Sequence, residues 1–128
     1  MKPDLEKPFV VRFARAFGYA FHGIAIVSRD RMFRCQLIAA VVVIALTAWL
    51  GATPVEWSIL ALTIGGVLAL EAMNSAIESC VDLAMPESHP IAARAKDVAA
   101  GSVLLFSMAS VVVGVCILGP KILDRLMT

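Results

Sequence analysis

Three apolar segments, each long enough to cross a lipid bilayer, constrain what this chain can fold into more than any other feature of its sequence. A spanning α-helix needs about 20 apolar residues at about 1.5 Å each. The segments run over residues 32–50, 54–83 and 90–118. With 60% hydrophobic and 16% charged residues, so short a chain is too apolar for a soluble domain. We expect an all-α integral membrane protein with residues 1–128 as one domain.

Helix start and stop signals bound these segments. Gly51 suits the C-terminal cap of the first span, and Thr53–Glu56 has the pattern of a capping box with proline at the first helical position. His89-Pro90 begins the third helix, whose first two turns project beyond the membrane. Gly119-Pro120 is predicted to end that helix.

The segment before the first span, residues 6–28, is amphipathic. One face at 100° per residue is apolar, and the other carries polar side chains. The apolar face holds Phe9, Phe13, Phe17, Ala20, Phe21 and Ile24, and the polar face holds Arg12, Arg15, Tyr19 and His22. This pattern predicts a helix lying in the membrane interface. A packed helix of a soluble bundle is the alternative.

Lysine and arginine are distributed unevenly along the chain. Seven lie within residues 1–34, none lies in residues 51–56, and two lie at 94 and 96. The positive-inside rule therefore places the N-terminus and the second loop in the cytoplasm, and the C-terminus on the outer side of the membrane. The net charge of +1 provides no field to attract nucleic acid, so no such partner is expected.

A stripe of polar side chains follows one face of the second span near its cytoplasmic boundary. Glu71, Asn74, Glu78 and Asp82 lie at i, i+3, i+7 and i+11, within about 80° of one another. Ionisable residues in a spanning helix indicate a functional site. A polar seam between helices is the alternative for this stripe.

Charged residues that could act with this stripe come from the same side of the membrane. They are Arg12, Arg15, Arg29, Asp30, Arg31, Arg34, Arg94, Lys96 and Asp97. Carboxylates suit Mg²⁺, which binds a few acids together with substrate phosphates, and basic groups suit phosphate. The combination indicates phosphoryl transfer at the lipid–water boundary.

Simpler interpretations stay open. Arg94 and Asp97 could form a surface ion pair, the arginines before the first span could only set topology, and His89 could only cap a helix. A rival function is a small ion- or proton-translocating subunit that uses the carboxylates of Glu71, Glu78 and Asp82.

Two motifs, EAMNSAIESCVDL and HPIAARAKDVAAGSVLL, resemble the signatures of the small bacterial diacylglycerol kinase family, which includes undecaprenol kinases. The resemblance covers nearly the whole chain. It implies an integral membrane kinase that moves the ATP γ-phosphate onto a lipid hydroxyl, working as a homotrimer with active sites shared between subunits.

The resemblance also implies roles for individual residues. Glu71 matches the general base, and Asp30 and Glu78 match magnesium-binding positions. The positions that bind nucleotide in the family correspond in this chain to Arg12, Tyr19, Asn74, Glu78, Glu87, Ser88, His89, Lys96 and Asp97. The lipid acceptor is expected to contact Arg12, Phe33 and Glu71.

Asp30 is where the chain departs from the family, which has glutamate there and one more residue after the position of Gly23. The alternative for Asp30 is an i, i+4 pair with Arg34. Gln36 stands where some members have glutamate. The residues do not separate diacylglycerol from undecaprenol as acceptor.

Overall fold

The computed structural model describes residues 8–127, which form four helices joined by short connections. They are α1 (Phe9–Val27), α2 (Arg31–Leu50), α3 (Pro54–Ala84) and α4 (Pro90–Met127). All four are long and apolar enough to cross a membrane. The all-α prediction is confirmed, and α2 and α3 begin and end within one residue of the predicted bounds.

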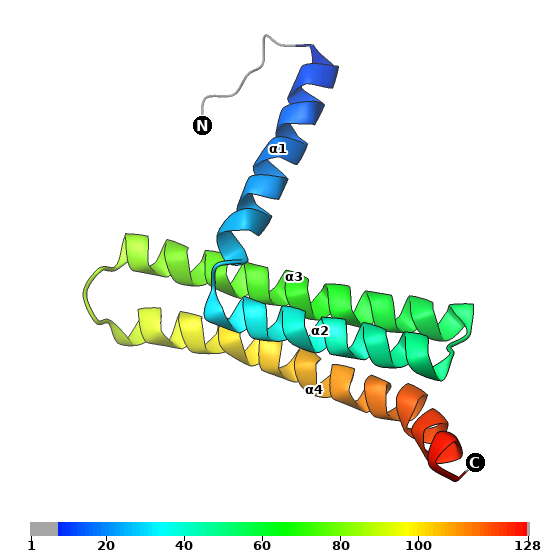
Figure 1. Cartoon of the computed structure of the whole chain (residues 1–128). Coiled ribbons are helices and arrows are strands. Elements are labelled where there is room, and N and C mark those ends of the chain that lie inside the picture. The colour runs from blue at the N-terminus through cyan, green and yellow to red at the C-terminus, as the bar shows by residue number, and fades with distance from the viewer. Residues whose placement is uncertain (1–7, 128) are drawn as a thin grey trace.

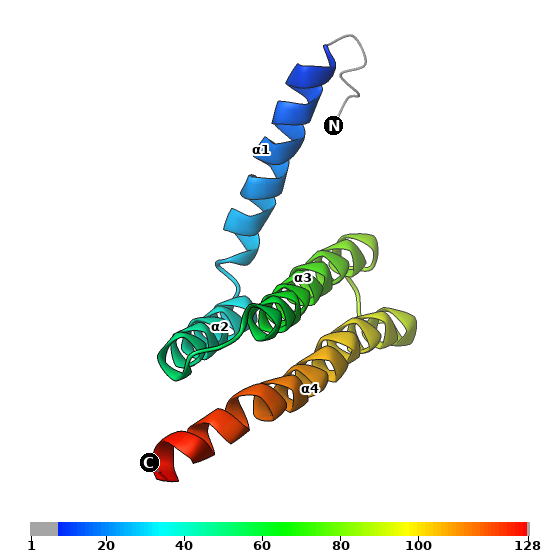
Figure 2. The ribbon, with the colours of Figure 1, turned by 90° about the vertical axis from the view of Figure 1, so that its right-hand side faces the viewer.

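Helices α2, α3 and α4 lie side by side as an antiparallel bundle (Figure 1). Helix α1 leaves this bundle at a steep angle in both views (Figures 1 and 2). Its only buried residue is Val27, at its C-terminal end. Three aromatic rings of the predicted apolar face contact one another along its exposed length: Phe9 stacks on Phe13, and Phe13 meets Phe17 edge to face. Helix α1 therefore runs across the bundle axis. This is the direction of a helix that lies in the interface of a membrane crossed by the bundle.

The predicted caps form. The Thr53 hydroxyl accepts a hydrogen bond from the Glu56 backbone N–H at 3.3 Å, and the Thr53 N–H donates to the Glu56 carboxylate at 2.7 Å. Gly51 ends α2 with φ of +73°, which glycine adopts without steric cost. His89 Nδ1 accepts from the Ile91 N–H at 3.2 Å, so this histidine does cap α4.

The predicted end of the last helix at Gly119-Pro120 is wrong, because α4 continues through Pro120 to Met127. Its last turns are attached to the other helices by two contacts. Lys121 pairs with Glu56 at 3.2 Å, and the Arg125 guanidinium lies 5.5 Å from the Trp49 ring centroid. A proline removes one helical hydrogen bond, and these tertiary contacts stabilise the continuation.

Few side chains are buried within the bundle. The apolar ones are Phe33, Ala40, Leu60, Val67, Ala99, Val103 and Leu118, and Val27 at the end of α1 is buried against them. Most large apolar side chains of α2–α4 point outward, which suits lipid as the surrounding medium. Lipid is as apolar as a protein core, so helices in a membrane gain little by burying apolar side chains against one another. They associate instead through close packing at small residues. Gly66 of α3 is such a residue, since a Cβ there would overlap the Phe106 ring of α4.

We predict that Gly66→Ala is less stable than Gly65→Ala. A Cβ at Gly65 meets nothing within 4 Å, so that variant gains about 0.5–1 kcal/mol of helix stability. At Gly66 the new methyl group displaces the Phe106 ring, which costs about 1–3 kcal/mol. Thermal unfolding of both variants in detergent measures the difference. Equal midpoints would show that α3 and α4 do not pack closely at Gly66.

Candidate functional site

Five polar side chains meet where α1 joins α2, beside the second half of α3. We call Asp30, Glu71, Asn74, Ser75 and Glu78 the acidic cluster, and this end of the bundle the acidic end. Four of them share one face of α3, because they lie at i, i+3, i+4 and i+7. The fifth, Asp30, precedes the first residue of α2, and the antiparallel arrangement places it opposite that face.

Asp30 contacts α3 through its side chain. It occupies the N-cap position of α2, yet its carboxylate makes no capping hydrogen bond. It accepts instead from the Ser75 hydroxyl at 2.8 Å. The Asp30 side chain is thus directed toward α3. Ser75 was not predicted as a site residue, although its spacing from Glu71 and Glu78 places it on the same face.

Glu71 is the most buried member of the cluster, with 5% of its surface exposed. The neighbouring charges that act on it electrostatically are the carboxylates of Glu78 and Asp30. Burying a carboxylate among other carboxylates is costly unless a cation or a hydrogen-bond donor joins it. This arrangement is therefore suited to a positively charged or proton-donating ligand.

Asn74 links Glu78 to the cluster. Its amide nitrogen donates to a Glu78 carboxylate oxygen at 3.0 Å. Its carbonyl oxygen Oδ1 is buried and accepts no hydrogen bond within the described part of the chain. Across residues 8–127, no three His, Cys, Asp or Glu side chains gather closely enough to enclose a metal ion. A metal here would need ligands from a substrate as well.

Other predicted residues lie beside the cluster, nearer the turn between α3 and α4. Lys96 of α4 pairs with Asp82 of α3, which joins the two helices one turn beyond Glu78. The lysine side chain is 35% exposed and the aspartate 65%, so the pair itself adds little stability. Asp97, Glu87 and Ser88 are exposed at the same end.

The predicted residues of α1 are not brought to the cluster. Arg12 and Tyr19 are exposed on α1, which meets the bundle only near Val27 (Figures 1 and 2). Phe33, predicted to contact the lipid acceptor, is 7% exposed and packs inside the bundle. A single chain therefore assembles the carboxylates and leaves the α1 residues apart from them.

Comparison with known proteins gives consistent results. A family model described as prokaryotic diacylglycerol kinase matches residues 18–118. The chain is 39% identical to the undecaprenol kinase of Bacillus subtilis over 112 residues, which cover 87% of this chain and 91% of that protein. It is 40% identical over 111 residues to a diacylglycerol kinase of Synechocystis, with 85% and 63% covered. It is 31% identical over 102 residues to that of Escherichia coli K12, with 79% and 84% covered.

We predict that Ser75→Ala destabilises the protein and Ser79→Ala does not. Ser75 connects α3 to Asp30, and its loss removes a hydrogen bond to a charged group, worth about 1.5–3 kcal/mol. The Ser79 hydroxyl only donates to the Ser75 carbonyl of its own helix, so its loss is nearly neutral. Thermal unfolding in detergent compares the two. Equal stabilities would contradict the contact between Asp30 and α3.

Proposed function

The chain belongs to the prokaryotic diacylglycerol kinase family, and from that membership we propose that it transfers the γ-phosphate of ATP to the hydroxyl of a lipid alcohol. The acceptor would be diacylglycerol or undecaprenol, the substrates in the names of its relatives. The observation that carries this proposal is the acidic cluster at one end of an apolar helical bundle. Ionisable groups at that end would lie where a lipid hydroxyl and a water-soluble nucleotide can meet.

Glu71 is proposed as the general base. Its buried carboxylate would take the proton of the acceptor hydroxyl as the oxygen attacks the γ-phosphorus. The bond from that phosphorus to the bridging oxygen breaks, and ADP leaves. Positioning and charge stabilisation carry such a transfer, so no covalent intermediate with the protein is required.

Magnesium is proposed as the metal, held by Asp30 and Glu78. The donor set fits it, because carboxylate and amide oxygens are hard ligands and Asn74 Oδ1 at this position is buried without a partner. When bound, the ion neutralises charge on the transferring phosphates. Two protein carboxylates with substrate oxygens match the incomplete cage that Mg²⁺ prefers.

The nucleotide is proposed to bind on the aqueous side of the cluster. Lys96 would contribute positive charge to the phosphates, with Asn74, Asp97 and the connection Glu87–His89 around it. Arg12 and Tyr19 would complete the site from α1. Because α1 stands away from its own bundle, it must either fold toward that bundle or reach another subunit's. A homotrimer with shared sites, as the family resemblance implies, supplies the second arrangement.

The bundle is proposed to cross the inner membrane with its acidic end on the cytoplasmic side. ATP is found in the cytoplasm, and most Lys and Arg residues lie at this end of the bundle. In this orientation the end of α4 is outside.

The charges of Glu71, Glu78 and Asp82 all lie at one end of the bundle, which disfavours the alternative of an ion- or proton-translocating subunit. A relay across the membrane would need such groups along the span, and α3 has none between Glu56 and Glu71.

The proposed activity is tested with purified protein in mixed micelles, supplied with ATP, Mg²⁺ and either diacylglycerol or undecaprenol. We expect ATP consumption that depends on added lipid alcohol and phosphate that appears on the lipid. Failure to phosphorylate either alcohol would refute the proposal. Ion flux in vesicles without ATP would support the translocating alternative.

We predict that Glu71→Gln abolishes phosphoryl transfer, because the amide keeps the size of the side chain and loses the base. General bases contribute about 10²–10⁴-fold, so more than about a tenth of the normal turnover contradicts the assignment. Glu56→Gln is the control. It removes a carboxylate at the other end of α3 and should lower stability while retaining turnover.

We predict that Glu78→Gln and Asp30→Asn each raise the Mg²⁺ concentration needed for half-maximal activity, because a neutral amide is a poorer ligand for a hard cation. Asp82→Asn is the control, since that carboxylate pairs with Lys96. Mg²⁺ titration of the three variants gives the comparison. A shift as large in Asp82→Asn would contradict a specific metal role for Asp30 and Glu78.

A further inference from the structure

Ser75 differs from other hydroxyl-bearing residues of the helices in where its hydrogen bond goes. A serine or threonine inside a helix often donates to the carbonyl one turn earlier, as Thr63 and Ser79 do here. The Ser75 hydroxyl donates instead to Asp30 Oδ2, 45 residues away along the chain. It therefore leaves its local acceptor, the Glu71 carbonyl, for a carboxylate of another segment.

Asp30 also makes no hydrogen bond to its own helix through its side chain. It is the N-cap residue of α2, where an aspartate ordinarily accepts from an N–H of the first turn, yet that bond is absent. Arg34, one turn along α2, forms no ion pair with it among the described residues. Both partners have thus exchanged local contacts for a contact between helices. Such a charge-assisted hydrogen bond is about twice as strong as a neutral one.

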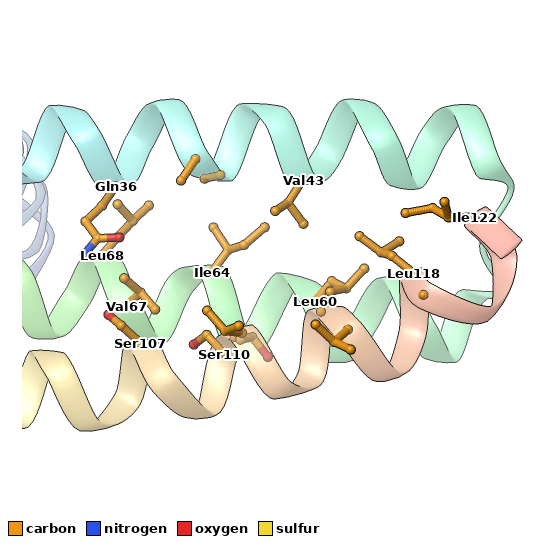
Figure 3. A pocket seen from close by; sticks show the side chains of 17 residues that line it. Gln36, Val43, Leu60, Ile64, Val67, Leu68, Ser107, Ser110, Leu118 and Ile122 are labelled. Atoms are coloured by element: carbon orange, nitrogen blue, oxygen red, sulfur yellow. The ribbon is translucent and has the colours of Figure 1, made fainter.

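The start of α2 has no second hydrogen bond of this kind to α3. Within residues 8–127, the bond from Ser75 to Asp30 is the one side-chain hydrogen bond between these two segments. Further along, α2, α3 and α4 border a groove of about 440 Å³, and Gln36 lies in its wall beside Leu68 (Figure 3). Gln36 is thus directed into the groove and away from Asp30. The direction of the Asp30 carboxylate therefore depends on Ser75.

This hydrogen bond holds the Asp30 carboxylate beside the face of α3 that carries Glu71 and Glu78. Ser75 follows Glu71 by four residues and precedes Glu78 by three, so it shares that face with both. The preceding residue, Asn74, donates to the Glu78 carboxylate at 3.0 Å. Adjacent residues of α3 thus hold one carboxylate each, one from their own helix and one from α2. These two donors set how the carboxylates proposed to bind Mg²⁺ lie relative to each other.

Mg²⁺ is sensitive to such an arrangement. It requires nearly octahedral geometry with ligand oxygens at about 2.0–2.1 Å, so a carboxylate that turns aside no longer contributes to the site. Groups that orient a metal ligand by hydrogen bonding typically account for about 10–100-fold in metal affinity. Without the Ser75 hydroxyl, the Asp30 carboxylate is released to the N–H groups at the start of its own helix.

We propose that Ser75 is a positioning residue of the metal site, whose hydroxyl holds the Asp30 carboxylate in place to bind Mg²⁺ together with Glu78. This inference rests on the proposed function and adds to it a residue that does not itself touch the ion. Asp30 is exposed, so an ion that arrives with a nucleotide from water can reach the carboxylate that Ser75 holds.

Metal binding to the whole chain in detergent tests this role without turnover. The probe is Mn²⁺, which takes the same oxygen ligands as Mg²⁺, added together with β,γ-methylene ATP, whose terminal phosphate is not transferred. The EPR signal of free Mn²⁺ gives both the Kd and the number of sites. Ser75→Ala is compared with Ser79→Ala, the matched control, because the Ser79 hydroxyl donates only within α3.

We expect Ser75→Ala to raise the Kd for Mn²⁺ by about tenfold or more and Ser79→Ala to leave it unchanged. Ser75→Thr should stay near the unaltered protein, because threonine keeps a hydroxyl donor. Ser75→Cys has only a weak donor and should bind as poorly as Ser75→Ala, so it decides the matter if the alanine variant does not fold. A normal Kd in either variant overturns the inference, as does an equal loss in Ser75→Thr.

The number of sites separates positioning from a purely structural role. A structural role would lower the number of folded sites and leave their Kd unchanged, and that result overturns the inference.

A double-mutant cycle with Asp30→Ala shows whether Ser75 acts through Asp30. Asp30→Ala alone should weaken Mn²⁺ binding at least as much as Ser75→Ala does. Adding Ser75→Ala to it should raise the Kd by less than about twofold more, because residues that act as one unit do not contribute additively. A further loss as large as that of Ser75→Ala alone would mean that Ser75 acts independently of Asp30, which overturns the inference.

Lipid phosphorylation by the unaltered protein separates this inference from the proposed function. Transfer of phosphate to a lipid alcohol, together with normal Mn²⁺ binding in Ser75→Ala, overturns only the role of Ser75. No transfer to either alcohol refutes the kinase function itself. Absence of Mn²⁺ binding in the unaltered protein would overturn the metal site and, with it, the role of Ser75.

Discussion

In hydrocarbon, a backbone group or charge without a partner costs several kcal/mol, and the arrangement of this protein follows from that constraint. Its apolar segments are helices, which satisfy their backbone groups internally. Hydroxyl groups in the spans return to their own helices, as Thr47, Thr63 and Ser110 do when they donate to carbonyls one turn earlier. Ionisable side chains are thereby restricted to the two ends of the bundle.

The two ends satisfy their charges differently. At the end that holds the α2–α3 connection, Glu56 receives the Thr53 N–H and pairs with Lys121, and Arg125 lies over the Trp49 ring. These groups complement one another and attach α4 to the helices beside it. At the acidic end, Glu71 is buried near two other carboxylates. The first arrangement stabilises the fold, and the second leaves binding capacity for a ligand.

Polar atoms without partners mark the same half of the molecule. Asn74 Oδ1 and Ser107 Oγ are buried and unpaired within the described residues, one in the acidic cluster and the other on α4. A buried acceptor or donor of this kind loses its hydration without compensation.

Local features of the sequence were sufficient for the helices and for one face of the site. Apolar length, Thr53–Glu56 and Gly51 depend on residues within a turn or two of one another, so they predicted the spans and their caps. The same holds for Glu71, Asn74 and Glu78, because helical periodicity alone aligns them. The resemblance of two motifs to the family then indicated the chemistry that we propose for that face.

Contacts between distant segments were decided only by the tertiary structure. Asp30 meets Ser75 from 45 residues away, and Lys96 pairs with Asp82 across a turn. The continuation of α4 through Pro120 overrides a strong local stop signal, because Lys121 and Arg125 find partners on α3 and α2. Periodicity within one helix fixes which residues share a face, and only packing determines what that face meets.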